Sequence, residues 1–272
     1  MKKYPIGFHT SINKEHKERV PAEVRKEIAE PKKSIVQVYF PHRDMEWSYY
    51  NDSFDLKAGD FVYVEGALEG YRGQVTEVHY SFKIKLSDYK KVVAVIDTKV
   101  KGDFYLAESH VVSFDKNVIP FSKVLTWFKA PESDEEYVSG NDEANRFPLD
   151  ELSKMKISHG AADRGYDYYV ENKVVFVEID GTHGHAIVEG NKNYEIEFEY
   201  CDGVISNLKC SCFCSGACKH EFAAMLQLRE SLVFITENYE EEYNGYFAII
   251  SKGVFMNTVL NKKGSGKISL EV

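Results

Sequence analysis

Hydrophobic and polar residues alternate along several short stretches of the chain. The alternation is clearest over residues 194–200, where aromatic or aliphatic side chains are separated by glutamates. Successive side chains of a strand point to opposite faces, so this pattern predicts a strand with one buried face and one acidic face. Similar short runs predict ten more strands: residues 34–40, 61–64, 74–78, 92–96, 104–107, 174–179, 184–188, 204–208, 246–250 and 254–260.

Helical periodicity is found in fewer places. In residues 221–232, Phe222, Met225, Leu226 and Arg229 lie three or four positions apart, which predicts a helix with one apolar stripe. Shorter helices are expected at residues 149–157 and near residues 21–28. Strands and helices together predict an α+β protein.

The strands divide the chain into regions. Those of the first half are short, lie between glycine-marked turns and resemble SH3-like barrels, so a small N-terminal β-barrel is expected. An acidic stretch follows, with seven acidic side chains and one arginine, and is expected to be an exposed linker. The predicted organisation is an arm, a barrel-like domain, a linker and a mixed C-terminal domain: residues 1–33, 34–128, 129–150 and 151–272.

Composition limits the functional classes. Hydrophobic residues make up 43% of the chain and charged residues 28%, as in folded domains. The net charge of −9 argues against a general nucleic-acid coating protein, which would normally be basic. No apolar run approaches the roughly 18 residues of a membrane span, and no signal peptide is evident. We therefore expect a cytoplasmic protein without a membrane partner.

One basic segment stands out against this acidic background. Lysines alternate with aromatic residues, in an arrangement that suits contact with a nucleic-acid backbone while rings stack on bases. The alternative is a solvated strand edge protected by lysines. The residues concerned are Lys83, Lys85, Lys90 and Lys91, with Phe82 and Tyr89 between them.

A cysteine cluster gives the strongest chemical prediction. Four of the five cysteines lie between residues 210 and 218, a spacing typical of a metal site rather than of disulfides. The preferred ligand set is Cys210, Cys212, Cys218 and His220, because five residues then separate the two pairs. Pairing Cys212 with Cys214 leaves only three. A buried cluster of apolar thiols is the other interpretation. Three thiolates and one imidazole would hold a structural zinc ion with no open position.

The order strand, Cys210-Ser211-Cys212, Cys218-Lys219-His220 and helix resembles a SWIM-type zinc finger. The resemblance covers about residues 158–230 and places a ββα finger at about residues 194–232. Proteins of this family bind zinc and are attached to helicases, transposases and kinases. The resemblance therefore implies binding to DNA or to a protein partner such as a helicase, with a pure protein-interaction adaptor as the alternative.

Other candidate sites are weaker. His183-Gly184-His185 is a possible metal pair, but no carboxylate or cysteine stands at ligand spacing in the sequence, which favours a hairpin turn. No phosphate-binding glycine loop, nucleophile elbow or zincin helix is present. We therefore predict a non-catalytic protein without a small-molecule substrate.

Overall fold

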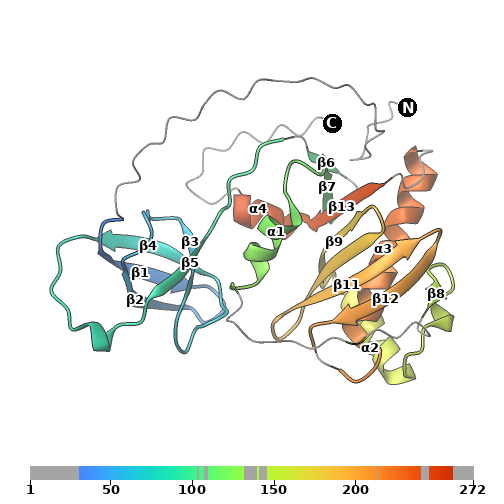
Figure 1. The fold of residues 1–272 in the computed structure, drawn as a ribbon, viewed down its shortest axis with the longest axis horizontal. Coiled ribbons are helices and arrows are strands. Elements are labelled where there is room, and N and C mark those ends of the chain that lie inside the picture. The colour runs from blue at the N-terminus through green and yellow to red at the C-terminus, as the bar shows by residue number, and fades with distance from the viewer. Residues whose placement is uncertain are drawn as a thin grey trace. The chain divides into compact units, whose positions relative to one another are not determined.

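The computed structural model describes residues 31–102, 104–106, 110–131, 140, 146–212, 214–239 and 245–259. Over these ranges the chain is a mixed α+β protein with two antiparallel sheets and four α-helices (Figure 1), as the sequence predicts. It forms two compact units. The N-terminal unit holds described residues 31–98 and 129–131, and the C-terminal unit holds the others. The predicted arm and linker lie mostly outside the described residues.

The N-terminal unit is a five-stranded sheet in the order β2-β1-β4-β3-β5. Alternate valines of β1 and β3 are fully buried and form its core with Phe40 and Leu56. Gly73 lets β4 approach this core, since a Cβ there would lie 2.4 Å from the Val38 side chain. The strands are β1 (Ser34–Phe40), β2 (Met45–Asn51), β3 (Phe61–Val64), β4 (Gly73–His79) and β5 (Val92–Ile96).

This sheet is not a closed barrel, which corrects the prediction from the sequence. Its outer strands, β2 and β5, meet at a single bridge between Tyr50 and Lys91. There the Tyr50 N–H donates to the Lys90 carbonyl over 2.9 Å. One bridge is not a ladder, so in the described residues the sheet curls towards closure without completing it.

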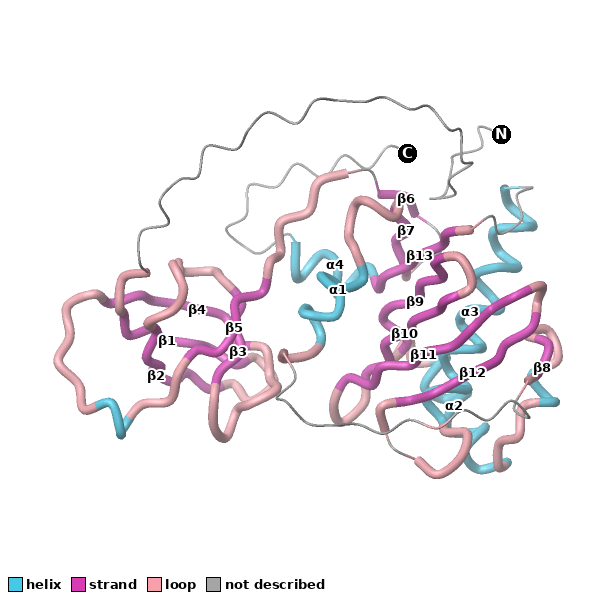
Figure 2. Tube along the Cα trace, in the orientation of Figure 1, coloured by secondary structure: helices cyan, strands magenta, loops and turns pink. Residues whose placement is uncertain are grey.

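The C-terminal unit contains an eight-stranded sheet in the order β6-β7-β13-β9-β10-β11-β12-β8 (Figure 2). Its centre is an antiparallel meander of β9 to β12, flanked by β13. The strands are β6 (Phe104–Leu106), β7 (Val111–Phe114), β8 (Phe147–Pro148), β9 (Val174–Asp180), β10 (His183–Glu189), β11 (Asn193–Cys201), β12 (Val204–Cys210) and β13 (Tyr246–Ser251).

Strands β6 and β7 correct the expected extent of the barrel-like domain, residues 34–128. β7 pairs with β13, which lies more than a hundred residues further along the chain, and β6 pairs with β7, so both belong to the C-terminal unit. Their side chains explain why. Phe104 and Val111 are almost completely buried in this unit, and Phe104 packs on Phe255, with ring centroids 4.5 Å apart.

One face of the larger sheet, the helix face, is covered by α3 (Lys219–Tyr239), which Figure 2 shows running behind β9 to β12. Inward side chains such as Ala186, Ile196 and Phe198 pack there against buried residues of α3 such as Met225 and Leu228. A second helix, α2 (His159–Val170), packs on α3. The alternation predicted for β11 is confirmed at its centre, where Ile196 and Phe198 are buried.

The opposite face is the polar face. It carries the glutamates of β11, the histidines of β10 and Glu178 of β9, and is partly covered by α1 (Phe121–Phe128). The Phe121 ring stacks on His185 at 4.0 Å and lies 5.8 Å from the ring of Phe176.

Two of the predicted elements have a different structure. Residues 254–260 were expected to be a strand, but α4 (Lys252–Val259) is a helix whose Phe255 and Thr258, three positions apart, face the core. Tertiary burial of this stripe outweighs the strand preference of the β-branched residues. The helix expected over residues 149–157 is only the 3-10 turn η2 (Leu152–Lys154).

No helix in the described ranges combines the length and apolar content needed to cross a membrane.

Gly165 sets the distance between α2 and α3. A Cβ at this position would lie 2.8 Å from the Lys219 carbonyl oxygen and 3.0 Å from Phe222. We expect Gly165→Ala to lower the free energy of unfolding by about 1–3 kcal/mol, because the helices must move apart. Denaturant unfolding followed by circular dichroism measures this change.

Gly160→Ala is the matched control on the same helix. Its added Cβ would meet only the flexible Arg164 side chain, at 3.6 Å. The higher helix propensity of alanine should leave stability unchanged or raise it by up to about 1 kcal/mol. Equal losses in both variants would contradict the role given to Gly165.

Glu178 makes stability depend on pH. Burial raises the pKa of this carboxyl from 4.5 to about 7. Its contribution to stability is fully present below pH 4.5 and is lost as the pH rises through 7, because the charged form must then stay buried. At about 1.4 kcal/mol per pKa unit, the loss is on the order of 3 kcal/mol.

We therefore expect Glu178→Gln to raise the melting temperature by several degrees at pH 8.5 and by much less at pH 5. Glu171→Gln, which removes an exposed carboxylate from the same unit, is the control. Thermal unfolding at both pH values tests this. An equal shift at both would show that burial of the charge at residue 178 is not its cause.

Candidate metal centre

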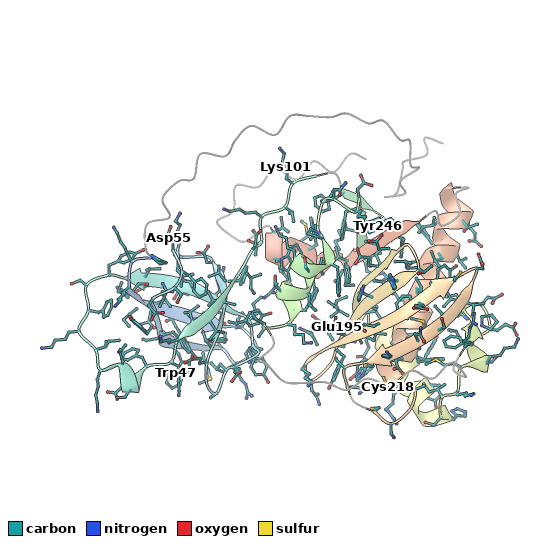
Figure 3. All side chains as sticks on the ribbon, viewed as in Figure 1. Trp47, Asp55, Lys101, Glu195, Cys218 and Tyr246 are labelled. Carbon is teal, nitrogen blue, oxygen red and sulfur yellow. The ribbon has the colours of Figure 1, made fainter. Side chains whose placement is uncertain are left out.

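Three cysteines and one histidine meet where the end of β12 approaches the start of α3. Their ligand atoms, one from each of Cys210, Cys212, Cys218 and His220, all lie within 4.8 Å of one another. Cys210 ends β12 and Cys212 follows it, while Cys218 and His220 flank the first residue of α3. Figure 3 labels Cys218 at this junction. The structure thus assembles the predicted set and leaves Cys214, which is exposed, outside the cluster.

The spacing of the cluster matches the edges of a metal tetrahedron. Nδ1 of His220 lies 3.7 Å from the Sγ atoms of both Cys210 and Cys218. A zinc ion with bonds of about 2.3 Å to sulfur and 2.0–2.1 Å to nitrogen would separate these atoms by about 3.6 Å. The residues therefore fit a single metal ion. Because all four donors come from the protein, they would fill a tetrahedral coordination shell.

Cys218 also caps α3. The Cys218 N–H donates to the Glu221 carboxylate over 2.7 Å, and the Glu221 N–H donates back to the Cys218 sulfur over 3.5 Å. This reciprocal pair is a capping box in which cysteine takes the usual place of serine or threonine. The cap fixes the first turn of α3, so Cys218 and His220 are positioned by the helix itself.

Two aromatic rings hold the His220 imidazole. Tyr194 of β11 stacks on it with ring centroids 3.9 Å apart, and Tyr168 of α2 contacts it edge-on at 5.5 Å. His220 is only 4% exposed, and its Nε2 has no hydrogen-bond partner among the described residues. Packing therefore orients the ring on the Nε2 side, and Nδ1 faces the two sulfurs.

Lys219 ties α2 to the same junction. Its ammonium group donates to the Tyr168 hydroxyl over 2.8 Å and lies 4.2 Å from the centre of that ring. The loop before it is also anchored, since Ser211 exchanges hydrogen bonds with the backbone of Glu195 on β11. The cluster is thus fixed by β11, α2 and α3 together.

The sulfurs are electrostatically coupled. A hydrogen bond from the Cys210 thiol lowers the pKa of Cys218 to about 4, and the same interaction raises the pKa of Cys210. Burial raises the pKa of Cys212 to about 12. Three thiolates at this spacing require a cation among them. Metal binding should therefore displace protons and become stronger as the pH rises.

Three residues that support the cluster were assigned no role from the sequence: Tyr168, Tyr194 and Glu221. Tyr168 and Tyr194 are separated from His220 in sequence, and their contact with it depends on tertiary structure. Glu221 had a recognisable local signal, because Cys218-x-x-Glu221 has the spacing of a capping box with sulfur in place of a hydroxyl.

Fold and site together define a mixed α+β protein with a Cys₃His cluster compatible with a metal ion. Comparison with protein-family models, with curated proteins and with solved structures gave no match.

Single serine substitutions test the ligand set. Cys210→Ser, Cys212→Ser and Cys218→Ser should each weaken metal binding more than about 100-fold, because each removes a donor. Cys214→Ser is the matched control and should bind as the unaltered chain does. Titration with Co²⁺, read from the thiolate-to-cobalt charge-transfer absorption, reports this site alone. Loss of that absorption in Cys214→Ser would assign the ligands differently.

Proposed function

We propose that this chain is a non-catalytic zinc-binding protein whose metal centre, similar to a SWIM-type zinc finger, stabilises a surface for binding partners. The observation that carries this proposal is the convergence of three sulfurs and one imidazole within 4.8 Å. Sulfur and imidazole donors in tetrahedral arrangement are typical of zinc. Such a site leaves no position for substrate or water, which supports a structural role.

The ion would join the end of a strand to the beginning of a helix. Because α2 packs on α3 around Gly165, the position of α2 depends on the same junction. Exposed apolar side chains on α2, Tyr166 and Val170, are each 56% exposed. The zinc ion would therefore fix a helical surface that carries accessible aromatic and aliphatic groups.

Nucleic acid is the first candidate partner, and the N-terminal unit supports it. The loop between β4 and β5 carries four exposed lysines and one aspartate, and Tyr80 at its start is 53% exposed. Only Lys91 among these lysines forms an ion pair with a described residue, at 2.9 Å from Asp52. Lys83 and Lys85 are thus available for phosphate contacts, with Tyr80 available to stack on a base.

A protein-interaction adaptor is the second candidate. The net charge of −9 disfavours strong binding to phosphates, and the exposed side chains of α2 suit a protein surface. This role predicts stable co-purification with a helicase or another protein partner that nuclease treatment does not disrupt.

Charge reversal in the loop distinguishes the candidates. If the loop binds single-stranded nucleic acid, Lys83→Glu with Lys85→Glu should weaken binding of a labelled oligonucleotide. It should also make the slope of log affinity against log salt shallower by about 1.4, because two phosphate contacts are lost. Fluorescence anisotropy at several salt concentrations measures both changes.

Lys33→Glu with Lys57→Glu alters the net charge equally and is the control, since both lysines are exposed and lie outside the loop. Binding that falls equally in both double variants would reflect net charge alone. An unaltered chain that binds no oligonucleotide at low salt would exclude the nucleic-acid role and favour the adaptor.

A further inference from the structure

The polar face of the larger sheet holds a second set of metal-ligating side chains. His183 and His185 lie two residues apart on β10 and therefore share this face. In the antiparallel register, Glu199 of β11 is directly opposite His183, and Glu197 is directly opposite His185. The four side chains occupy the corners of one rectangle on the sheet, with cross-strand Cβ atoms about 4.5–5.5 Å apart.

Strand pairing brings carboxylate groups to the histidine pair, which could not be seen from the sequence. The histidine pair was interpreted as a hairpin turn because no carboxylate or cysteine stands at ligand spacing in the sequence. The fold places two carboxylates of β11 beside it, from a strand that begins four residues after β10 ends. On the other side of β10, Asp180 and Glu178 of β9 lie opposite the same histidines. Two imidazoles with one or two carboxylates are a donor set that divalent transition metals accept.

The same residues line a cavity. Its volume is about 220 Å³, and its wall also includes Lys209 and Asn207 of β12. None of these polar side chains forms a hydrogen bond or an ion pair with another described residue. Nδ1 of His185 is buried and has no hydrogen-bond partner among the described residues. Polar side chains that line a cavity and have no partner in the protein are able to bind a ligand from solution.

The backbone is irregular at this position. The register between β11 and β12 shifts between Glu197 and Glu199, and Asn207 has a φ of 54° inside β12. A bulge redirects side chains and interrupts the regular ladder, and such features are frequent beside functional sites. Here the shift lies at the carboxylates that face the histidines.

We propose that His183 and His185, together with Glu197, form a second metal site for a divalent transition-metal ion such as zinc. This site differs in kind from the cysteine cluster. It uses nitrogen and oxygen donors and would leave a coordination position open towards the cavity, beside Lys209. In the described residues only the cysteine cluster has three or more ligand atoms within 4.8 Å of one another. At the second site, the side chains of His183 and Glu197 must rotate before their ligand atoms can reach a single ion. Both side chains are exposed and have room to do so.

Metal stoichiometry tests this proposal on the full-length protein. The chain is saturated with Co²⁺, and bound cobalt is counted after equilibrium dialysis. Thiolate-to-cobalt absorption separately reports occupancy of the cysteine cluster. We expect two ions per chain, of which one gives no thiolate absorption.

His183→Gln and Glu197→Gln should each reduce affinity at the second site by at least tenfold and leave the thiolate absorption unchanged. Glu195→Gln is the matched control, because this glutamate lies on the same strand and face but opposite Ile187. It should retain two ions. One ion in the unaltered chain, or two ions held with unchanged affinity in the His183 and Glu197 variants, would overturn the proposal.

Discussion

The C-terminal unit depends on one constraint, the meeting of β12 and α3 at the cysteine cluster. Cys210 belongs to the sheet, while Cys218 and His220 belong to the first turn of the helix. Only nine residues separate Cys210 from His220, the first and last of the four ligand positions. The short loop between strand and helix must therefore fold back tightly. Clustered thiolates would repel one another, and a cation is the simplest way to make this loop geometry favourable.

The cluster is supported from several sides. The capping box between Cys218 and Glu221 fixes the helix start without reference to a metal, and Tyr194 fixes the imidazole from the sheet. α2 adds Tyr168 from the remaining side, at a distance allowed by Gly165. Packing thus positions the donors in advance, so that less conformational entropy remains to be lost when an ion binds.

Local features were predictable and long-range ones were not. The ligand set follows from spacing within eleven residues, and the centre of β11 follows from its alternation, because both depend on neighbours in the sequence. The pairing of β7 with β13 joins distant segments, and no pattern within either strand specifies it. For the same reason residues 99–128, which include β6 and β7, were assigned to the N-terminal domain instead of the C-terminal unit. The helix α4 was mistaken for a strand because burial, rather than propensity, decides short apolar runs.

The carboxylates opposite His183 and His185 are also a long-range feature, because only strand pairing brings them together. They lie on β11, which contributes side chains to both candidate metal sites. Tyr194 of β11 turns to the helix face and stacks on His220, whereas Glu197 and Glu199 turn to the polar face. Side chains alternate with a period of two, so a slip of one residue in the register would exchange these roles. The tyrosine would leave the cysteine cluster and the glutamates would enter the core. The burial of Ile196 and Phe198 makes such a slip unfavourable, and the same hydrophobic contacts thereby fix both sets of donor atoms.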